Sequence, residues 1–132
     1  MVAETVEAPT TGRIVLIAED EILVRLDISD YLRAHGYGVI EANSAAEAIQ
    51  VLKNGLEVAA VFTDVRMPGT VDGIDLARYV QNHHPHLPVV ITSGHVSPKE
   101  VPAALGPFIA KPYDRVRVLE TIEQLLRQGE KK

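Results

Sequence analysis

The chain has 132 residues, a formal net charge of −5 and no cysteine. This length suits one domain, and the lack of cysteine excludes a disulfide scaffold, thiol catalysis and thiolate metal sites. The acidic balance argues against non-specific binding of nucleic acid. No apolar run approaches the ~18 residues of a membrane span, and the N-terminus lacks the basic and apolar regions of a signal peptide. We therefore expect a cytoplasmic protein with one acidic domain, without direct contact to membranes or nucleic acid.

Short apolar runs, rich in branched side chains, predict strands that are buried on both faces. They cover 14–18, 38–42, 58–64, 87–92 and 107–110. Between these runs, apolar residues recur at the spacing of a helix. The first expected helix ends near residues 35–36, and the second runs from a cap at Ser44 to about Asn54. The third includes residues 76–80, and the last covers about 113–128 at the end of the chain.

The remaining segments are expected to be less regular. Residues 1–12 are polar and lack periodicity, which predicts a flexible N-terminal arm before a domain over 13–128, and residues 129–132 are expected to fray. Between the fourth and fifth strands, Ser97 and Pro98 form a good helix start. Pro102, however, offers no N–H and would clash with the carbonyl group of Pro98. We expect one helical turn followed by irregular chain up to Gly106, and thus a shortened fourth helix.

Alternating strands and helices predict an α/β fold with a parallel sheet and helices on both faces. Functional sites in such sheets form beyond the carboxyl ends of the strands. Reactive polar residues follow or end four of the five predicted strands: Glu19 and Asp20, Asp64, Ser93, and Lys111. We expect these side chains to form one site.

The acidic members of this set predict a metal site. Carboxylates within roughly 4–6 Å of one another repel by a few kcal/mol per pair at an effective dielectric constant near 20, so that three of them need a counter-ion. Oxygen ligands without histidine or thiolate favour Mg²⁺, for which Mn²⁺ can substitute. A magnesium ion beside a carboxylate, an ammonium group and a hydroxyl is suited to phosphoryl transfer, in which a carboxylate attacks phosphorus.

Four motifs carry a resemblance to a known family. They are AEDE (18–21), FTDVRMPG (62–69), TSG (92–94) and FIAKPY (108–113). In order and spacing they resemble the receiver domain of two-component response regulators, and the resemblance covers about residues 13–128. It implies the flavodoxin-like, doubly wound fold of the chemotaxis regulators, with five parallel strands in the order 2-1-3-4-5.

The resemblance also implies a role for each matching residue. Asp64 would accept a phosphoryl group from a histidine kinase or a phosphotransfer protein. Glu19, Asp20 and Asp64 would form the acidic pocket. Asp20 and Asp64 would bind Mg²⁺ directly, Glu19 would act through water, and the backbone carbonyl group of Arg66 would supply a further ligand.

Three further roles follow from the same resemblance. Ser93 would be the switch hydroxyl, Lys111 would pair with the phosphoryl group, and Phe108 would be the switch aromatic, without the hydroxyl of the more familiar tyrosine. His95 and Arg66 would influence the access of water to the acyl phosphate. The Lys111–Pro112 bond is typically cis in this family.

The chain is expected to act alone, as a single-domain receiver. Only four residues follow Gln128, so we expect it to signal through contacts with a downstream protein, and phosphorylation could also drive a homodimer. It would not be an enzyme beyond phosphorylating itself from small donors and losing that group again. Two alternatives stay open: a magnesium-dependent phosphohydrolase with an aspartyl nucleophile, and a receiver used only for constitutive contacts. A flavin carrier is disfavoured, because the acidic residues after the first strand would repel a flavin's phosphate.

Overall fold

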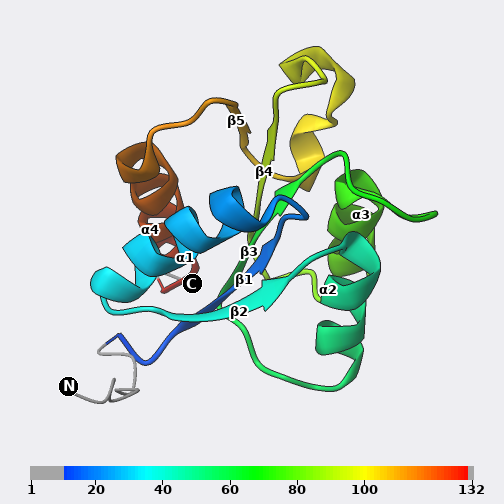
Figure 1. Cartoon of the computed structure of the whole chain (residues 1–132). Helices are drawn as coiled ribbons and strands as arrows, with labels where there is room; N and C mark the ends of the chain where they lie inside the picture. The colour runs from blue at the N-terminus through cyan, green and yellow to red at the C-terminus, as the bar shows by residue number, and fades with distance from the viewer. Residues whose placement is uncertain (1–10, 131–132) are drawn as a thin grey trace.

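The computed structural model describes residues 11–130, which form one parallel sheet with helices on both faces (Figure 1). The strands lie in the order β2-β1-β3-β4-β5, and every neighbouring pair is parallel. Their bounds are β1 Ile14–Ala18, β2 Gly38–Ala42, β3 Ala60–Asp64, β4 Val89–Ser93 and β5 Phe108–Ala110. The α-helices are α1 Ile22–Ala34, α2 Ala45–Lys53, α3 Gly73–His83 and α4 Arg115–Glu130. The predicted fold and strand order are confirmed.

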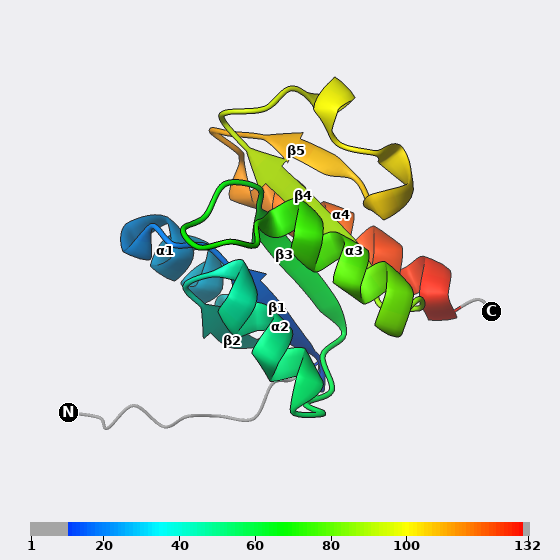
Figure 2. The ribbon, with the colours of Figure 1, turned by 90° about the vertical axis from the view of Figure 1, so that its right-hand side faces the viewer.

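Two hydrophobic cores, one on each face of the sheet, hold these layers together. Figures 1 and 2 show α1 and α4 on one face and α2 and α3 on the other. Alternate residues of a strand point to opposite faces, so that Leu16 of β1 packs toward α2 and α3 whereas Val15 and Ile17 pack toward α1 and α4. All of β3 and β4 is buried, as their continuous apolar runs predict.

Local hydrogen bonds set the ends of the helices that border the sheet edge. Ser44 Oγ accepts from the Glu47 amide at 3.1 Å, as predicted, although the Glu47 carboxylate accepts from Asn43 rather than from Ser44. At the start of α3, Asp72 and Asp75 each accept from the other's backbone amide, at 2.9 and 2.8 Å. This pair of bonds anchors the loop that follows β3.

The last helix differs from its predicted bounds at both ends. It begins at Arg115 rather than Tyr113, because the Asp114 carboxylate accepts from the Val116 amide at 2.9 Å and caps the helix. It continues to Glu130, which forms an ion pair with Arg13, so residues 129 and 130 are helical rather than frayed. The predicted N-terminal arm lies mostly outside the described residues. Its last part is anchored, since Thr11 donates to the Gly36 carbonyl group from both its amide and its hydroxyl.

Between β4 and β5 the chain forms no α-helix, but two 3-10 turns, over Pro98–Glu100 and Ala103–Leu105. The first turn and the break at Pro102 are as predicted, whereas the second turn was predicted to be irregular. Pro102 cannot continue the first turn, but its carbonyl group accepts from the Leu105 amide at 3.0 Å, and Leu105 is buried against the core. Two 3-10 turns therefore stand where the sequence predicted a shortened helix between β4 and β5.

Candidate functional site

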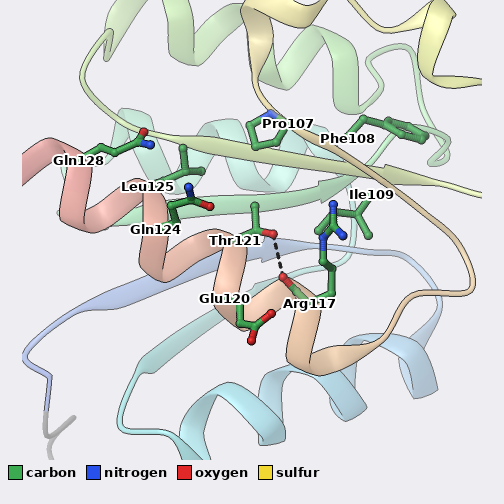
Figure 3. Close-up of a pocket in the computed structure, with 9 residues that line it drawn as sticks. All are labelled: Pro107, Phe108, Ile109, Arg117, Glu120, Thr121, Gln124, Leu125 and Gln128. Atoms are coloured by element: carbon green, nitrogen blue, oxygen red, sulfur yellow. Dashed lines mark hydrogen bonds between the residues drawn. The ribbon is translucent and has the colours of Figure 1, made fainter.

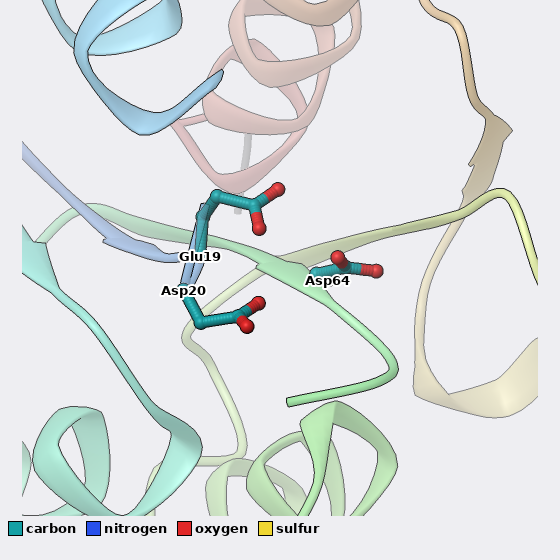
Figure 4. A group of neighbouring side chains, drawn as sticks. All are labelled: Glu19, Asp20 and Asp64. Atoms are coloured by element: carbon teal, nitrogen blue, oxygen red, sulfur yellow. The ribbon is translucent and has the colours of Figure 1, made fainter. Parts of the chain in front are cut away.

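The predicted acidic residues and the predicted lysine meet in one pocket at the carboxyl edge of the sheet. The pocket has a volume of about 440 Å³, and Glu19, Asp20, Asp64 and Lys111 all line it. Figure 4 shows the three carboxylates projecting to the same side of this edge. Each offers an oxygen within 4.8 Å of the others. Parallel strands produce this convergence, because they bring the carboxyl ends of β1, β3 and β5, and the residues directly after them, to the same edge.

Lys111 compensates part of the negative charge. Its Nζ lies 2.6 Å from Glu19 Oε1 and 2.8 Å from Asp64 Oδ2. Glu19 and Asp64 are only 4% and 6% exposed, whereas Asp20 is exposed. The other oxygens of the two buried carboxylates accept from backbone amides, Asp64 Oδ1 from Val65 and Glu19 Oε2 from Glu21. Both buried acids are thus held by two donors each.

Burial and charge shift the pKa values of three groups around the pocket. Burial raises the pKa of Glu19, since it outweighs the hydrogen bonds from Lys111 and the Glu21 amide, and the charge of Asp64 adds to the increase. Burial alone would lower the pKa of Lys111, but its hydrogen bonds to Asp64 and Glu19 raise that pKa instead. Burial raises the pKa of Tyr113 to about 12, and the negative charge of the nearby Glu19 is the second cause of this increase. Lys111 is therefore a permanent cation at neutral pH.

Ser93 ends β4 at the same edge but does not line the pocket. Its Oγ accepts from the amides of His95 and Val96, at 3.0 and 3.3 Å. These bonds occupy the oxygen and leave the hydroxyl hydrogen available as a donor. The structure therefore places Ser93 as the first residue of the turn that carries His95 over the pocket.

Phe108 and Ile109 point to opposite sides of β5 (Figure 3). Phe108 is half-buried and packs against the core formed with α2 and α3, whereas Ile109 belongs to the core formed with α1 and α4. Both also line a groove of about 450 Å³ between β5 and α4, together with Arg117 and other α4 residues. Phe108 is thus set apart from the acidic pocket, beside an exposed groove.

The mouth of the pocket is formed by two loops. Arg66, Met67 and Pro68 contribute from the loop after β3, and Gly94 and His95 from the loop after β4. The resemblance pointed to Arg66 and His95, whereas Met67, Pro68 and Gly94 were not singled out. The Lys111–Pro112 peptide bond is cis, as expected.

Close packing behind Asp64 leaves no space for a side chain at Gly73. A Cβ atom at this position would lie 1.8 Å from the Asp64 carbonyl oxygen. The Gly73 amide also donates to the Val65 carbonyl group at 2.8 Å. The start of α3 therefore supports the backbone that carries Asp64.

A family model described as the response regulator receiver domain matches residues 15–123. The chain is a member of this receiver domain family. The family consists of phosphoacceptor switches of two-component systems, which interact with histidine kinases or phosphotransfer proteins and bind Mg²⁺ at an acidic pocket. Membership confirms the predicted fold and the main functional interpretation.

Curated relatives contain this domain in several settings. The sensor kinase CckA of Brucella abortus is 34% identical over 119 residues, which cover 86% of this chain and 12% of that protein. The transcriptional regulatory protein FixJ of Bradyrhizobium diazoefficiens is 32% identical over 128 residues, which cover 92% of this chain and 60% of that protein. The receiver domain thus spans only part of these relatives, and its action as a stand-alone receiver stays a prediction.

Solved structures agree with the fold. A response regulator receiver protein from Sinorhizobium medicae has a TM-score of 0.83 and 29% identity, with 89% of this chain and 96% of that chain covered. The receiver domain of the hybrid histidine kinase CckA has a TM-score of 0.71 and 32% identity, with 86% and 98% covered. Over residues 11–130, none of the helices has the length and apolar character needed to cross a bilayer.

Proposed function

We propose that Asp64 accepts a phosphoryl group and that its modification switches the contacts of this receiver domain. The observation that carries the proposal is the environment of the Asp64 carboxylate. One oxygen is held by Lys111 and the other by the Val65 amide, in a pocket that three more carboxylates border. The side chain is therefore oriented toward the pocket, where a phosphorus atom could approach it.

The proposed step exchanges one bond for another. An Asp64 oxygen forms a bond to phosphorus as the bond between phosphorus and its donor breaks, and the electron pair of that bond stays with the donor. With a phosphohistidine donor the broken bond is P–N, and the histidine takes up a proton. Lys111 remains charged and can move its hydrogen bond from the Asp64 carboxylate to a phosphoryl oxygen.

The donor set of the pocket fits Mg²⁺, because three converging carboxylates carry more charge than one lysine compensates. We propose that Asp20 and Asp64 would bind the ion directly, that Glu19 would act through water, and that the Arg66 carbonyl group would be a further ligand. When bound, the ion supplies charge neutralisation for the phosphoryl oxygens. Mn²⁺ has the same preference for oxygen ligands.

Phosphorylation by acetyl phosphate, with and without Mg²⁺, tests the proposal. Labelling of Asp64 is expected only with Mg²⁺, and Asp64→Asn should abolish it. Asp30→Asn on the exposed face of α1 is the matched control and should be labelled like the parent. A labelled Asp64→Asn variant would refute the assignment. Release of many phosphates per chain from small esters would instead favour the phosphohydrolase alternative.

An apolar surface beside the pocket suggests where a donor protein docks. Ile22, Leu23 and Leu26 of α1 are 58%, 78% and 39% exposed, directly after the pocket residue Glu21. We expect Leu23→Ser to slow phosphoryl transfer from a phosphohistidine protein but not from acetyl phosphate. Leu56→Ser is the matched control, because Leu56 is also exposed but lies in the loop after α2.

The output side of the switch is proposed to involve Ser93 and Phe108. A Ser93 side chain that rotates to donate to a phosphoryl oxygen would withdraw its Oγ from the amides of His95 and Val96 and so release the turn after β4. The half-buried ring of Phe108 lies on the adjacent strand, β5, and its position is set by packing alone. We propose that the changed surface contacts a downstream protein or a second copy of this chain, and that these contacts rather than catalysis are the output.

A further inference from the structure

Arg25 connects three elements beneath the acidic pocket without lining the pocket itself. Its Nη1 donates to the backbone carbonyl group of Glu19 at 2.8 Å, and its Nε donates to Glu41 Oε1 at 3.1 Å. The side chain is only 14% exposed. One guanidinium group thus joins α1 to the end of β1 and to β2.

The geometry of α1 explains why Arg25 can make both bonds. Side chains on a helix lean toward its N-terminus, so the guanidinium group of a residue near the start of α1 returns over the end of β1. Glu41 lies on β2, the neighbour of β1, and its second oxygen accepts from Arg33 at 3.0 Å. Glu41 is therefore held from both sides and fixes the direction in which Arg25 points.

The carbonyl group that Arg25 binds belongs to the peptide between Glu19 and Asp20, the two acids that β1 contributes to the pocket. The amide of Glu19 already donates to the Ala42 carbonyl group at 3.0 Å. Because Arg25 donates to the carbonyl group of Glu19, both backbone groups of this residue are held by hydrogen bonds. A rotation of the Glu19–Asp20 peptide would turn the carboxylate of Asp20 away from Asp64.

We propose that Arg25 is a positioning residue for the Mg²⁺ site: it orients the peptide between Glu19 and Asp20 so that their carboxylates converge with that of Asp64. The inference rests on the proposed function, since it assumes that these three acids hold the ion. Arg25 itself would touch neither the ion nor the phosphoryl group.

Charge and orientation predict opposite effects when Arg25 is replaced by glutamine. Loss of a nearby positive charge, taken alone, strengthens the binding of a cation, because one repulsive interaction disappears. Loss of orientation weakens binding, because residues that hold metal ligands in place contribute about 10–100-fold to metal affinity. The sign of the change in Mg²⁺ affinity therefore distinguishes the two effects.

The experiment titrates Mg²⁺ into the full chain and follows binding by calorimetry and by amide NMR shifts, without a phosphodonor. We expect Arg25→Gln to weaken Mg²⁺ binding about 10-fold. Arg78→Gln is the matched control: it removes the same charge from an exposed position of α3, away from Glu19 and Glu41. Its affinity should equal or slightly exceed that of the parent.

A folded Arg25→Gln variant that binds Mg²⁺ as tightly as the parent, or more tightly, would overturn the inference. If that variant does not fold, Arg25→Met decides, because methionine keeps much of the apolar stem of arginine but has no donor for the Glu19 carbonyl group. It should bind Mg²⁺ more weakly than the parent, and equal affinity would overturn the inference. A parent protein that binds no Mg²⁺ would instead refute the proposed metal site.

Discussion

Replacing Lys111 by methionine would expose the electrostatic cost of the acidic pocket. Methionine keeps most of the apolar stem of lysine but leaves Glu19 and Asp64 without the ammonium group that lies 2.6 and 2.8 Å from them. Two charged oxygens within 4.8 Å of each other repel by about 3.5 kcal/mol at an effective dielectric constant of about 20. Protonation of Glu19, whose pKa is already raised, limits this cost. We expect the free energy of unfolding to fall by about 2–3 kcal/mol at pH 7.5 without divalent cations.

Thermal and urea unfolding, with and without Mg²⁺, measure this effect. The melting temperature of Lys111→Met should fall by roughly 10 °C. Added Mg²⁺ should raise it more in the variant than in the parent, because the ion meets more uncompensated charge. Lys99→Met, at an exposed lysine in the turn after β4, is the matched control and should change little. A Lys111→Met variant as stable as the parent without Mg²⁺ would refute the reasoning.

Three further outcomes test other parts of the structure. Gly106→Ala should lower the free energy of unfolding in urea by at least about 2 kcal/mol, because Gly106 has a φ of +145° and its Cβ would lie 2.0 Å from the Val89 carbonyl oxygen. Between pH 10.0 and about 12 the unfolded chain ionises Tyr113 while the folded chain keeps it neutral, so stability falls as pH rises. Tyr113→Phe should reduce this fall by roughly 1 kcal/mol after solvent screening, as urea midpoints at pH 9 and 11.5 would show. His95→Ala should shorten the acyl phosphate lifetime severalfold in a phosphate release assay, because His95 and Arg66 line the pocket and are expected to restrict the access of water to the acyl phosphate.

The fold was predictable because its determinants are local in the sequence. Runs such as IVLIA at 14–18 are apolar throughout, which suits strands covered on both faces, and the structure buries β3 and β4 completely. The errors lie where a single side chain competes with a pattern. Asp114 delays the start of α4 by capping it, and buried Leu105 stabilises a second turn where irregular chain was predicted.

The composition of the pocket was predictable, whereas its bonding was not. Strand ends place Glu19, Asp64 and Lys111 at one edge, and this follows from parallel topology alone. The two side chains that Lys111 contacts, and the amides that hold the other carboxylate oxygens, depend on rotamers and loop geometry. Arg25 was missed for the same reason: in the sequence it is one charged residue of a helix, and only the fold brings it to the Glu19 carbonyl group.

The bonds of Ser93 suggest how a charge at Asp64 would reach the surface. Its Oγ holds the amides of His95 and Val96, which begin the segment between β4 and β5. If Ser93 rotates to donate to a phosphoryl oxygen, both amides lose this acceptor. The segment that follows contains two 3-10 turns instead of an α-helix, so few backbone hydrogen bonds oppose its movement. The proposed signal would therefore pass through the loss of two local hydrogen bonds rather than through the rigid shift of a helix.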